Sequence, residues 1–180
     1  MSTPRPVPVL PNDVTGTRTE LVPETILRDT RERSPWTFDD CRVDLRDVTL
    51  STGDYAVPSQ CTHDPERDTY HPTFAVERKS ANDFLNAITW DRDRFTDELR
   101  RANGWSRPLS VVVEASWESL LRNRGDTSSR DVHPNQVVGT VSAWTRGYNV
   151  AFHFTGDRRR AELCGYLLLV RDGVVERVDG

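Results

Sequence analysis

The sequence predicts an α/β protein whose mixed sheet starts antiparallel and is flanked by helices. Short apolar runs suited to buried strands alternate with segments whose apolar residues recur every three or four positions, as on one face of a helix. Strands that are linked through helices are typical of the parallel part of a sheet. Near the N-terminus, two strand-like segments are instead joined by a short turn, which predicts an antiparallel hairpin.

The N-terminal part of the chain is expected to be a tail followed by strands. Residues 1–22 carry four prolines among small polar residues and show no apolar periodicity, so they are predicted to be a disordered tail. A first strand is expected at 25–27. The stretch 41–50 alternates in part between apolar and polar residues, and 54–57 follows after a turn. These two segments are therefore predicted to pair as a hairpin.

The middle of the chain predicts a loop, a strand and a capped helix. The polar segment 58–72 is expected to be a long loop, and 73–79 a strand. Ser80 and, three residues later, Asp83 have the pattern of a capping box, so a helix should begin directly after the strand. Beyond an irregularity near 90–91, the helical spacing of apolar residues continues with Phe95, Leu99 and Ala102.

The second half of the chain predicts strands and helices in alternation. They are expected in this order: a strand at 109–114, a short helix at 117–123, a polar loop at 124–133, a helix at 134–147, a strand at 148–154 and a last helix at 157–171. Residues 23–175 are therefore predicted to form one domain, and 176–180 a C-terminal tail.

Composition limits the classes of function. A formal net charge of −4 argues against a broadly basic nucleic-acid coat but allows a local groove lined by arginine. No apolar run approaches the roughly 18 residues that a membrane span requires, and residues 1–22 lack the apolar core of a signal peptide. The three cysteines are an odd number and far apart, which disfavours a disulfide framework. A soluble, cytoplasmic protein without a membrane partner is expected.

The strand that ends in Glu77-Arg78-Lys79 is the most informative place in the sequence. Alternation along a strand places Glu77 and Lys79 on one face and Arg78 on the other. A second carboxylate, Asp54, comes from the preceding hairpin strand. Carboxylates hold hard divalent cations through oxygen, and a neighbouring ammonium can position water or neutralise charge that builds up on a phosphate. This arrangement is the general PD-(D/E)xK nuclease pattern.

Lys79 is the only lysine in a chain with 24 cationic residues, the others being arginine. Where arginine serves every other cationic position, a lone lysine suggests that a compact, rotatable ammonium is needed. Two alternatives stay open. Acid-x-lysine triplets are common on solvated helix faces, and biased codon usage can leave one lysine by chance.

Other candidate features have simpler interpretations. A zinc site is disfavoured because only three candidate ligands lie near one another, namely Cys61, His63 and His71. The arginine run 158–160 is interpreted as a solvated helix start rather than a phosphate site. Trp36 and Trp105 are expected to pack in the protein rather than to stack on bases. The apolar last helix is expected to pack on the domain's own sheet, with dimerisation as the alternative.

The residues around Lys79 resemble the nuclease domain of the XPF family of structure-specific endonucleases. The family hallmark is Gly-Asp, a spacer, then Glu-Arg-Lys-x-x-x-Asp, and it is matched by Gly53, Asp54, Glu77, Arg78, Lys79 and Asp83. The resemblance covers about residues 24–170. It implies a restriction-endonuclease-like fold and cleavage of one DNA strand near junctions of duplex and single strand. It also implies Mg²⁺ or Mn²⁺ held by Asp54 and Glu77 with help from Asp29, and Lys79 as the catalytic lysine.

Further residues match the surroundings of the motif, each with an open alternative. Arg31 and Glu32 could orient the site or touch phosphate, or form an ion pair at a strand end. Arg78, on the opposite face, is expected to pair with Asp83 or another acid and to brace the helix. Arg94 could reach phosphate in the groove, or pair with the glutamate one turn along its helix.

Residues 23–175 are thus predicted to be an XPF-type nuclease domain that cuts branched or flap-like DNA in a metal-dependent reaction. No helix-hairpin-helix module follows the last helix, and whether the chain forms a homodimer or binds a partner protein that supplies duplex binding stays open. Two alternatives stay open. One is a non-catalytic DNA-binding or scaffold subunit that keeps the fold, and the other is a sequence-specific restriction-type nuclease.

Overall fold

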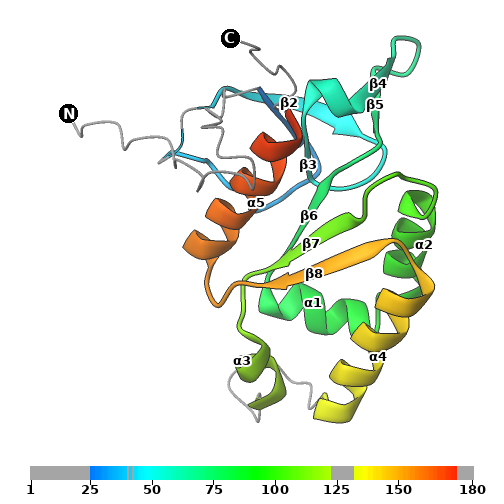
Figure 1. Cartoon of the computed structure of the whole chain (residues 1–180), viewed down its shortest axis with the longest axis vertical. Helices are drawn as coiled ribbons and strands as arrows, with labels where there is room; N and C mark the ends of the chain where they lie inside the picture. The colour runs from blue at the N-terminus through cyan, green and yellow to red at the C-terminus, as the bar shows by residue number, and fades with distance from the viewer. Residues whose placement is uncertain (1–24, 40, 42, 123–131, 174–180) are drawn as a thin grey trace, which may run out of the picture.

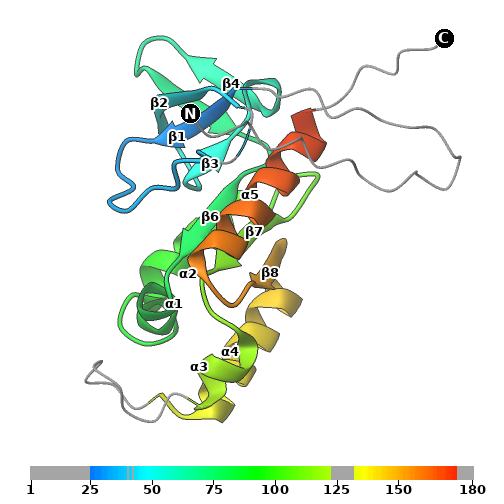
Figure 2. The ribbon, with the colours of Figure 1, turned by 90° about the vertical axis from the view of Figure 1, so that its left-hand side faces the viewer.

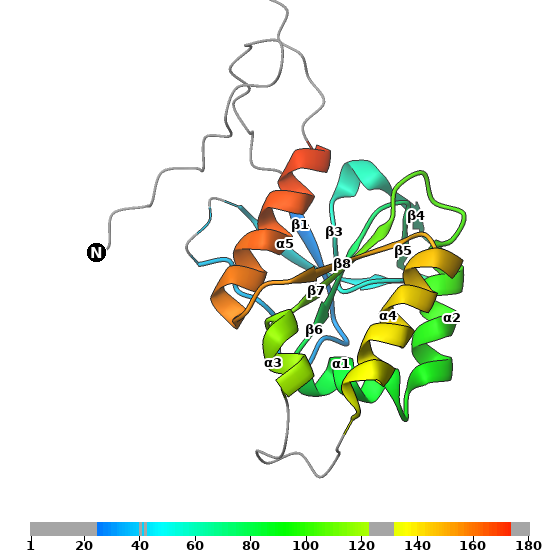
Figure 3. The same ribbon diagram turned by 60° about the horizontal axis from the view of Figure 1, so that its bottom comes forward.

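The computed structural model describes residues 25–39, 41, 43–122 and 132–173. Within these residues, one mixed sheet of eight strands forms the centre of the molecule, and helices cover both of its faces (Figures 1 and 3). The order across the sheet is β4-β5-β2-β1-β3-β6-β7-β8. The α/β class and the mixed, helix-flanked sheet predicted from the sequence are confirmed.

Most of the expected elements occur close to their expected boundaries. The strands are β1 (Ile26–Asp29), β2 (Leu45–Leu50), β3 (Tyr55–Ala56), β4 (Cys61–Asp64), β5 (Thr69–Pro72), β6 (Val76–Lys79), β7 (Leu109–Val113) and β8 (Val150–Phe154). The helices are α1 (Ala81–Ile88), α2 (Arg92–Ala102), α3 (Trp117–Arg122), α4 (Pro134–Gly147) and α5 (Arg158–Gly173), with a 3₁₀ turn η1 (Pro58–Gln60). The tails expected at 1–22 and 176–180, and most of the loop expected at 124–133, lie outside the described residues.

Strands β6, β7 and β8 form one parallel part of the sheet. β7 pairs in parallel with both neighbours, and all five of its residues are buried. Helices cover both faces of this strand, so its sequence is apolar throughout instead of alternating. The register pairs Lys79 with Val113, which places the carboxyl ends of β6 and β7 side by side.

The predicted hairpin of 41–50 with 54–57 is wrong, because β1 lies between β2 and β3. β1 pairs in parallel with β2 and antiparallel with β3. Ile26 and Leu27 on β1 are fully buried, and an apolar strand of this kind gains most from a neighbour on each side. A short turn between two strands cannot reveal that a third strand is inserted between them. β3 instead continues the antiparallel pairing to β6.

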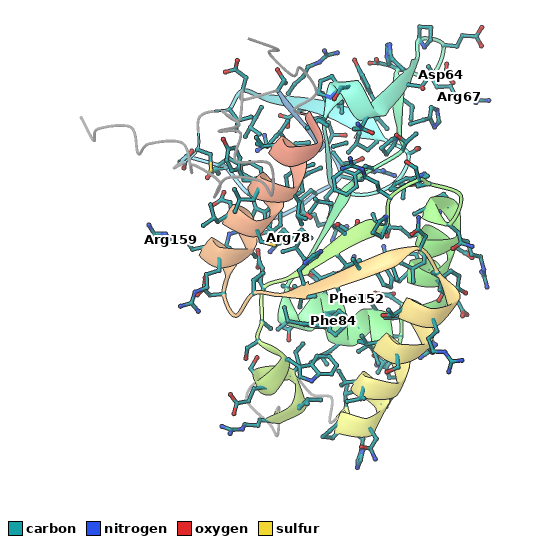
Figure 4. All side chains as sticks on the ribbon, viewed as in Figure 1. Asp64, Arg67, Arg78, Phe84, Phe152 and Arg159 are labelled. Carbon is teal, nitrogen blue, oxygen red and sulfur yellow. The ribbon has the colours of Figure 1, made fainter. Side chains whose placement is uncertain are left out.

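The loop predicted at 58–72 is also wrong in part, because it contains η1 and a hairpin of β4 and β5. β5 pairs in parallel with β2, and β4 forms the edge of the sheet. The hairpin turns at 65–68, and Asp68 there has a φ of 45°, a conformation that aspartate tolerates better than most residues. Figure 4 shows Asp64 and Arg67 at its tip. The two strands are polar and half-exposed, so they lack the apolar alternation that marks a strand.

Two apolar cores lie on opposite faces of the sheet. One packs α1, α2 and α4 against the sheet, and Figure 4 shows Phe84 of α1 close to Phe152 of β8. The other packs α5 along β6 and β7 (Figure 2), with Trp36 fully buried against it, as expected. Tyr166 and Val170 of α5 are buried in this core, so the last helix packs on its own sheet. None of the described helices has the length and apolar character needed to cross a membrane.

Candidate active site

Strand β6 presents its polar residues to opposite faces, as the alternation predicts. Ala75 belongs to the core under α1 and α2, whereas Val76 belongs to the core under α5. Glu77 and Lys79 share the face of Ala75 and form an ion pair. The Lys79 ammonium also lies 4.9 Å from the centre of the Phe95 ring on α2. The acid and the lysine of the motif therefore sit between the end of β6 and α2.

Asp54 is held against β6 by the turn that precedes β3. Gly53 has a φ of 80°, and a Cβ at this position would lie 2.6 Å from the Cβ of Ala75, so the turn requires glycine. The backbone N–H of Asp54 donates to the Val76 carbonyl at 2.9 Å, and the Arg78 backbone N–H donates to Oδ2 of Asp54 at 2.8 Å. The predicted convergence of Asp54 and Glu77 is therefore built by backbone contacts of two neighbouring strands.

The electrostatics of this group show that its acids lack compensating charge. Burial raises the pKa of Asp54 to about 7, even though Lys79 acts in the opposite direction. Burial also raises the pKa of Glu77 well above its usual range, and the charges of Asp54 and Glu98 add to the effect. Burial alone would lower the pKa of Lys79, but the neighbouring carboxylates, first Glu77 and then Asp54 and Glu98, raise it above its ordinary value. One ammonium thus faces several carboxylates.

Glu98 on α2 is a member of this site to which the sequence assigned only a pairing with Arg94. Its Oε1 accepts a hydrogen bond from the Gly53 N–H at 3.1 Å. Arg94 pairs instead with Asp91 at 3.6 Å, and its side chain is 84% exposed. The signal for Glu98 was present, because it lies three residues after Phe95 and four before Ala102, which both face the core. Helical spacing thus turns Glu98 toward β6.

Asp29 lies at the end of β1, and its carboxylate is already fully engaged. Oδ1 accepts from the backbone and the Nε of Arg31, and Oδ2 accepts from Nη2 of Arg31 and from the Leu50 N–H, all within 2.9 Å. Burial alone would raise the pKa of Asp29, but these hydrogen bonds hold it below its ordinary value. Asp29 therefore anchors Arg31 beside the site.

Arg78 lies on the α5 face, as expected, and pairs with acids other than Asp83. Its guanidinium donates to both carboxylate oxygens of Glu114 at 2.7 and 2.8 Å, and it approaches Glu32 at 3.4 Å. Asp83 instead forms the predicted capping box with Ser80 at the start of α1. Arg78 and Glu32 thus belong to a buried ion-pair network behind the site.

The acids and Lys79 line an open cleft of about 800 Å³ between the sheet and α2. The floor includes the half-buried Asp54 and the buried Glu77. The exposed residues that line the cleft are four arginines and two acids, namely Arg31, Arg33, Arg94, Arg101, Asp83 and Asp97. An acidic floor suits a divalent cation, and the excess of arginine makes a basic rim that suits the phosphates of a nucleic-acid backbone.

A comparison with models of protein families matches residues 28–167 to the ERCC4 domain. The chain belongs to this family. The match includes β6, the turn before β3 and α2, and the nuclease domain of the XPF family inferred from the motif is thereby confirmed. No curated protein matched the chain in a separate comparison of sequences.

Solved structures of archaeal XPF have the same fold as this ERCC4 domain. XPF from Aeropyrum pernix is 21% identical, with a TM-score of 0.58 over 83% of this chain and 66% of that one. XPF from Aeropyrum pernix in complex with DNA is 19% identical, with a TM-score of 0.59 over 86% of this chain and 68% of that one. The chain thus spans about two thirds of the length of these relatives.

The donors of this ERCC4 domain fit a divalent cation chemically. Asp54 and Glu77 supply carboxylate oxygens, and a bound cation would offset the burial and mutual repulsion that raise their pKa values. Among the described residues, no group of three or more acidic, histidine or cysteine side chains is arranged so that it could hold a metal ion in the present conformation. In the conformation described, Glu77 is paired with Lys79.

Proposed function

We propose that the protein is a divalent-metal-dependent endonuclease that hydrolyses phosphodiester bonds of DNA at branched or flap-like structures. The observation that carries this proposal is the convergence of Asp54, Glu77 and Lys79 in one cleft with an acidic floor and a basic rim. Membership of the ERCC4 family and the likeness to an XPF solved with DNA support DNA as the substrate.

Each residue of the cleft has a distinct proposed role. Asp54 and Glu77 would hold Mg²⁺ or Mn²⁺, which supplies polarisation of the phosphate and a lower pKa of bound water. Lys79 places a positive charge beside the reacting phosphate, where negative charge builds up in the transition state. Arg31, held by Asp29, and Arg94 neutralise the phosphates of the entering strand.

Asp29 is proposed to assist indirectly rather than as a third ligand. Each of its oxygens already accepts two hydrogen bonds, so binding a cation would require Arg31 or the Leu50 amide to let go. Glu98 is the stronger candidate for a third carboxylate, because it faces Asp54 and Glu77 from α2. Its Oε1 accepts a hydrogen bond from the Gly53 N–H, whereas the Asp29 carboxylate accepts the four described above.

Cleavage of labelled DNA tests this function. Flap, splayed-arm and plain duplex substrates are incubated with Mg²⁺, Mn²⁺ or a chelator, using the parent protein, Asp54→Asn and Glu77→Gln. We expect metal-dependent cutting of the branched substrates by the parent and a loss of at least about 100-fold in both variants. Asp47→Asn is the matched control, because Asp47 of β2 forms an ion pair with Arg28 of β1 outside the cleft.

The outcomes separate the alternatives. Cutting of unbranched duplex at fixed sequences would support a restriction-type nuclease instead. Binding of DNA without cutting, together with no heat of Mn²⁺ binding in calorimetry, would support a scaffold subunit that keeps the fold.

A further inference from the structure

Trp90 is exposed to solvent in a way that the other tryptophans of the chain are not. Its relative exposure is 75%, whereas Trp36 and Trp144 are buried and Trp105 and Trp117 pack against the core. Among the described residues, the other large apolar side chains that are exposed, Val138 and Leu163, reach only 41% and 45%. A large aromatic side chain with this exposure is characteristic of a contact surface rather than of the core.

Trp90 lies in the turn between α1 and α2, next in the chain to residues that line the cleft. Ala87 near the end of α1, and Asp91 and Arg94 at the start of α2, all line the cleft, so the tryptophan lies between lining residues on both sides. Figure 3 shows the two helices, both green, on the same side of the sheet.

Hydrogen bonds define the backbone of this turn. The Asp91 N–H donates to the Asn86 carbonyl at 2.9 Å, and the Thr89 hydroxyl donates to the Leu85 carbonyl at 2.9 Å. The Phe95 N–H then donates to the Asp91 carbonyl at 3.0 Å as α2 begins. Trp90 therefore belongs to a short hydrogen-bonded turn beside residues that line the cleft, and not to a long loop.

We infer that the Trp90 ring stacks on an unpaired base of the DNA substrate beside the phosphate bound in the cleft. The inference rests on the proposed nuclease function. Bases inside a duplex are already stacked on one another, whereas an unpaired base offers a free face to an indole. Arg94, four residues along, and Arg101, about two turns further on α2, add charge for the backbone of the same strand. A basic groove combined with an aromatic platform is the usual means of binding single strands. Trp90 would thus favour substrates with a single-stranded arm.

Binding of intact DNA tests this inference in the Asp54→Asn background, where cleavage is not expected. Fluorescence anisotropy is measured with labelled oligo-dT, a splayed-arm substrate and a plain duplex, for proteins that also carry Trp90→Ala or Trp90→Phe. We expect Trp90→Ala to weaken binding of oligo-dT and of the splayed arm by about 5- to 100-fold, which corresponds to about 1–3 kcal/mol. Duplex binding should stay within about twofold, and Trp90→Phe should keep most of the affinity because it keeps a π-face.

Matched controls separate this effect from damage to the fold. Leu163→Ala removes another exposed apolar side chain from α5, which packs on the opposite face of the sheet, and should change none of the affinities. The thermal midpoint of Trp90→Ala should equal that of the parent. Equal affinities of parent and Trp90→Ala for oligo-dT, or an equal loss on duplex and single strand, would overturn the inference. Because the readout is binding, a parent protein that cuts no DNA would refute the proposed nuclease function while the role of Trp90 is still decided.

Discussion

Replacing Lys79 by methionine removes the ammonium beside Asp54 and Glu77 while nearly preserving the length of the side chain. In the structure, this ammonium pairs with Glu77 and is influenced by the charges of Asp54 and Glu98. Loss of one preorganised charge beside a reacting group costs about 10²- to 10³-fold in rate, or about 3–4 kcal/mol. We expect a loss of that size in single-turnover cleavage of a labelled splayed-arm substrate at saturating Mn²⁺.

The pH dependence of the loss distinguishes a direct effect of the Lys79 ammonium on the phosphate from an indirect effect through the pKa of Asp54. Lys79 lowers the pKa of Asp54, so the methionine variant should hold the proton of Asp54 to a pH above the parent value of about 7. Measuring the loss at several pH values up to about pH 9 separates this indirect effect, which should diminish as the pH rises, from a direct one. A loss that vanishes near pH 9 would refute a direct role of the ammonium at the phosphate. Arg146→Met, on the exposed surface of α4, controls for the loss of one positive charge.

Lys79→Arg tests the meaning of the lone lysine. Arginine keeps the charge, but its planar guanidinium is larger and must fit between Glu77 and the Phe95 ring. We expect this variant to fold, with a circular-dichroism spectrum equal to that of the parent, and to lose most of its cleavage. Cleavage within about threefold of the parent would show that either cationic residue suffices at this position, and that the lone lysine reflects chance and not a chemical requirement.

Three further predictions concern the charges around the cleft. Cleavage at subsaturating metal should rise through about pH 7 as Asp54 ionises, and Glu98→Gln should move this midpoint to lower pH because one raising charge is removed. Asp54→Asn should raise the thermal midpoint near pH 8 without metal, and the free energy of unfolding there by up to about 4 kcal/mol, because the folded state raises the pKa of Asp54 to about 7 and its ionisation therefore destabilises the fold. Arg78→Met should lower the free energy of unfolding in urea by about 3–5 kcal/mol, because Glu114 and Glu32 then lose their buried partner.

Each of these predictions has a contradicting result. A midpoint that Glu98→Gln leaves unchanged would place Glu98 outside the electrostatic reach of Asp54. A lower thermal midpoint for Asp54→Asn near pH 8 would mean that the hydrogen bond from the Arg78 N–H outweighs the desolvation of the carboxylate. If Arg78→Met lowers the free energy of unfolding by less than about 1 kcal/mol, the buried network stabilises the fold no more than an exposed ion pair does.

The part of the site that the sequence predicts well is the part built by local periodicity. Alternation along β6 separates Glu77 and Lys79 from Arg78, and the structure keeps that separation on the two faces of the sheet. The capping box of Ser80 and Asp83 likewise marks the start of α1. Both patterns extend over a few consecutive residues, so they need no knowledge of the rest of the fold.

The features that escaped prediction depend on contacts between distant segments. The insertion of β1 between β2 and β3 is a choice of strand partner, which no local pattern encodes. Asp29 appears in the sequence as one more acid beside the motif, but its oxygens are occupied by Arg31 and the Leu50 amide once β1 and β2 pair. Glu98 enters the site only because α2 packs over β6, bringing it to the Gly53 amide.

Metal-dependent cutting of DNA through Asp54 is the central claim, and one measurement tests it most directly. A splayed-arm substrate labelled at one 5′ end is incubated with the parent protein and with Asp54→Asn, each in the presence of Mn²⁺ and then of a chelator. We predict a discrete cut near the junction for the parent with Mn²⁺ and none with the chelator, and a loss of at least about 100-fold for Asp54→Asn with Mn²⁺. Equal cutting by both proteins, or cutting that persists in the chelator, would contradict the proposed function.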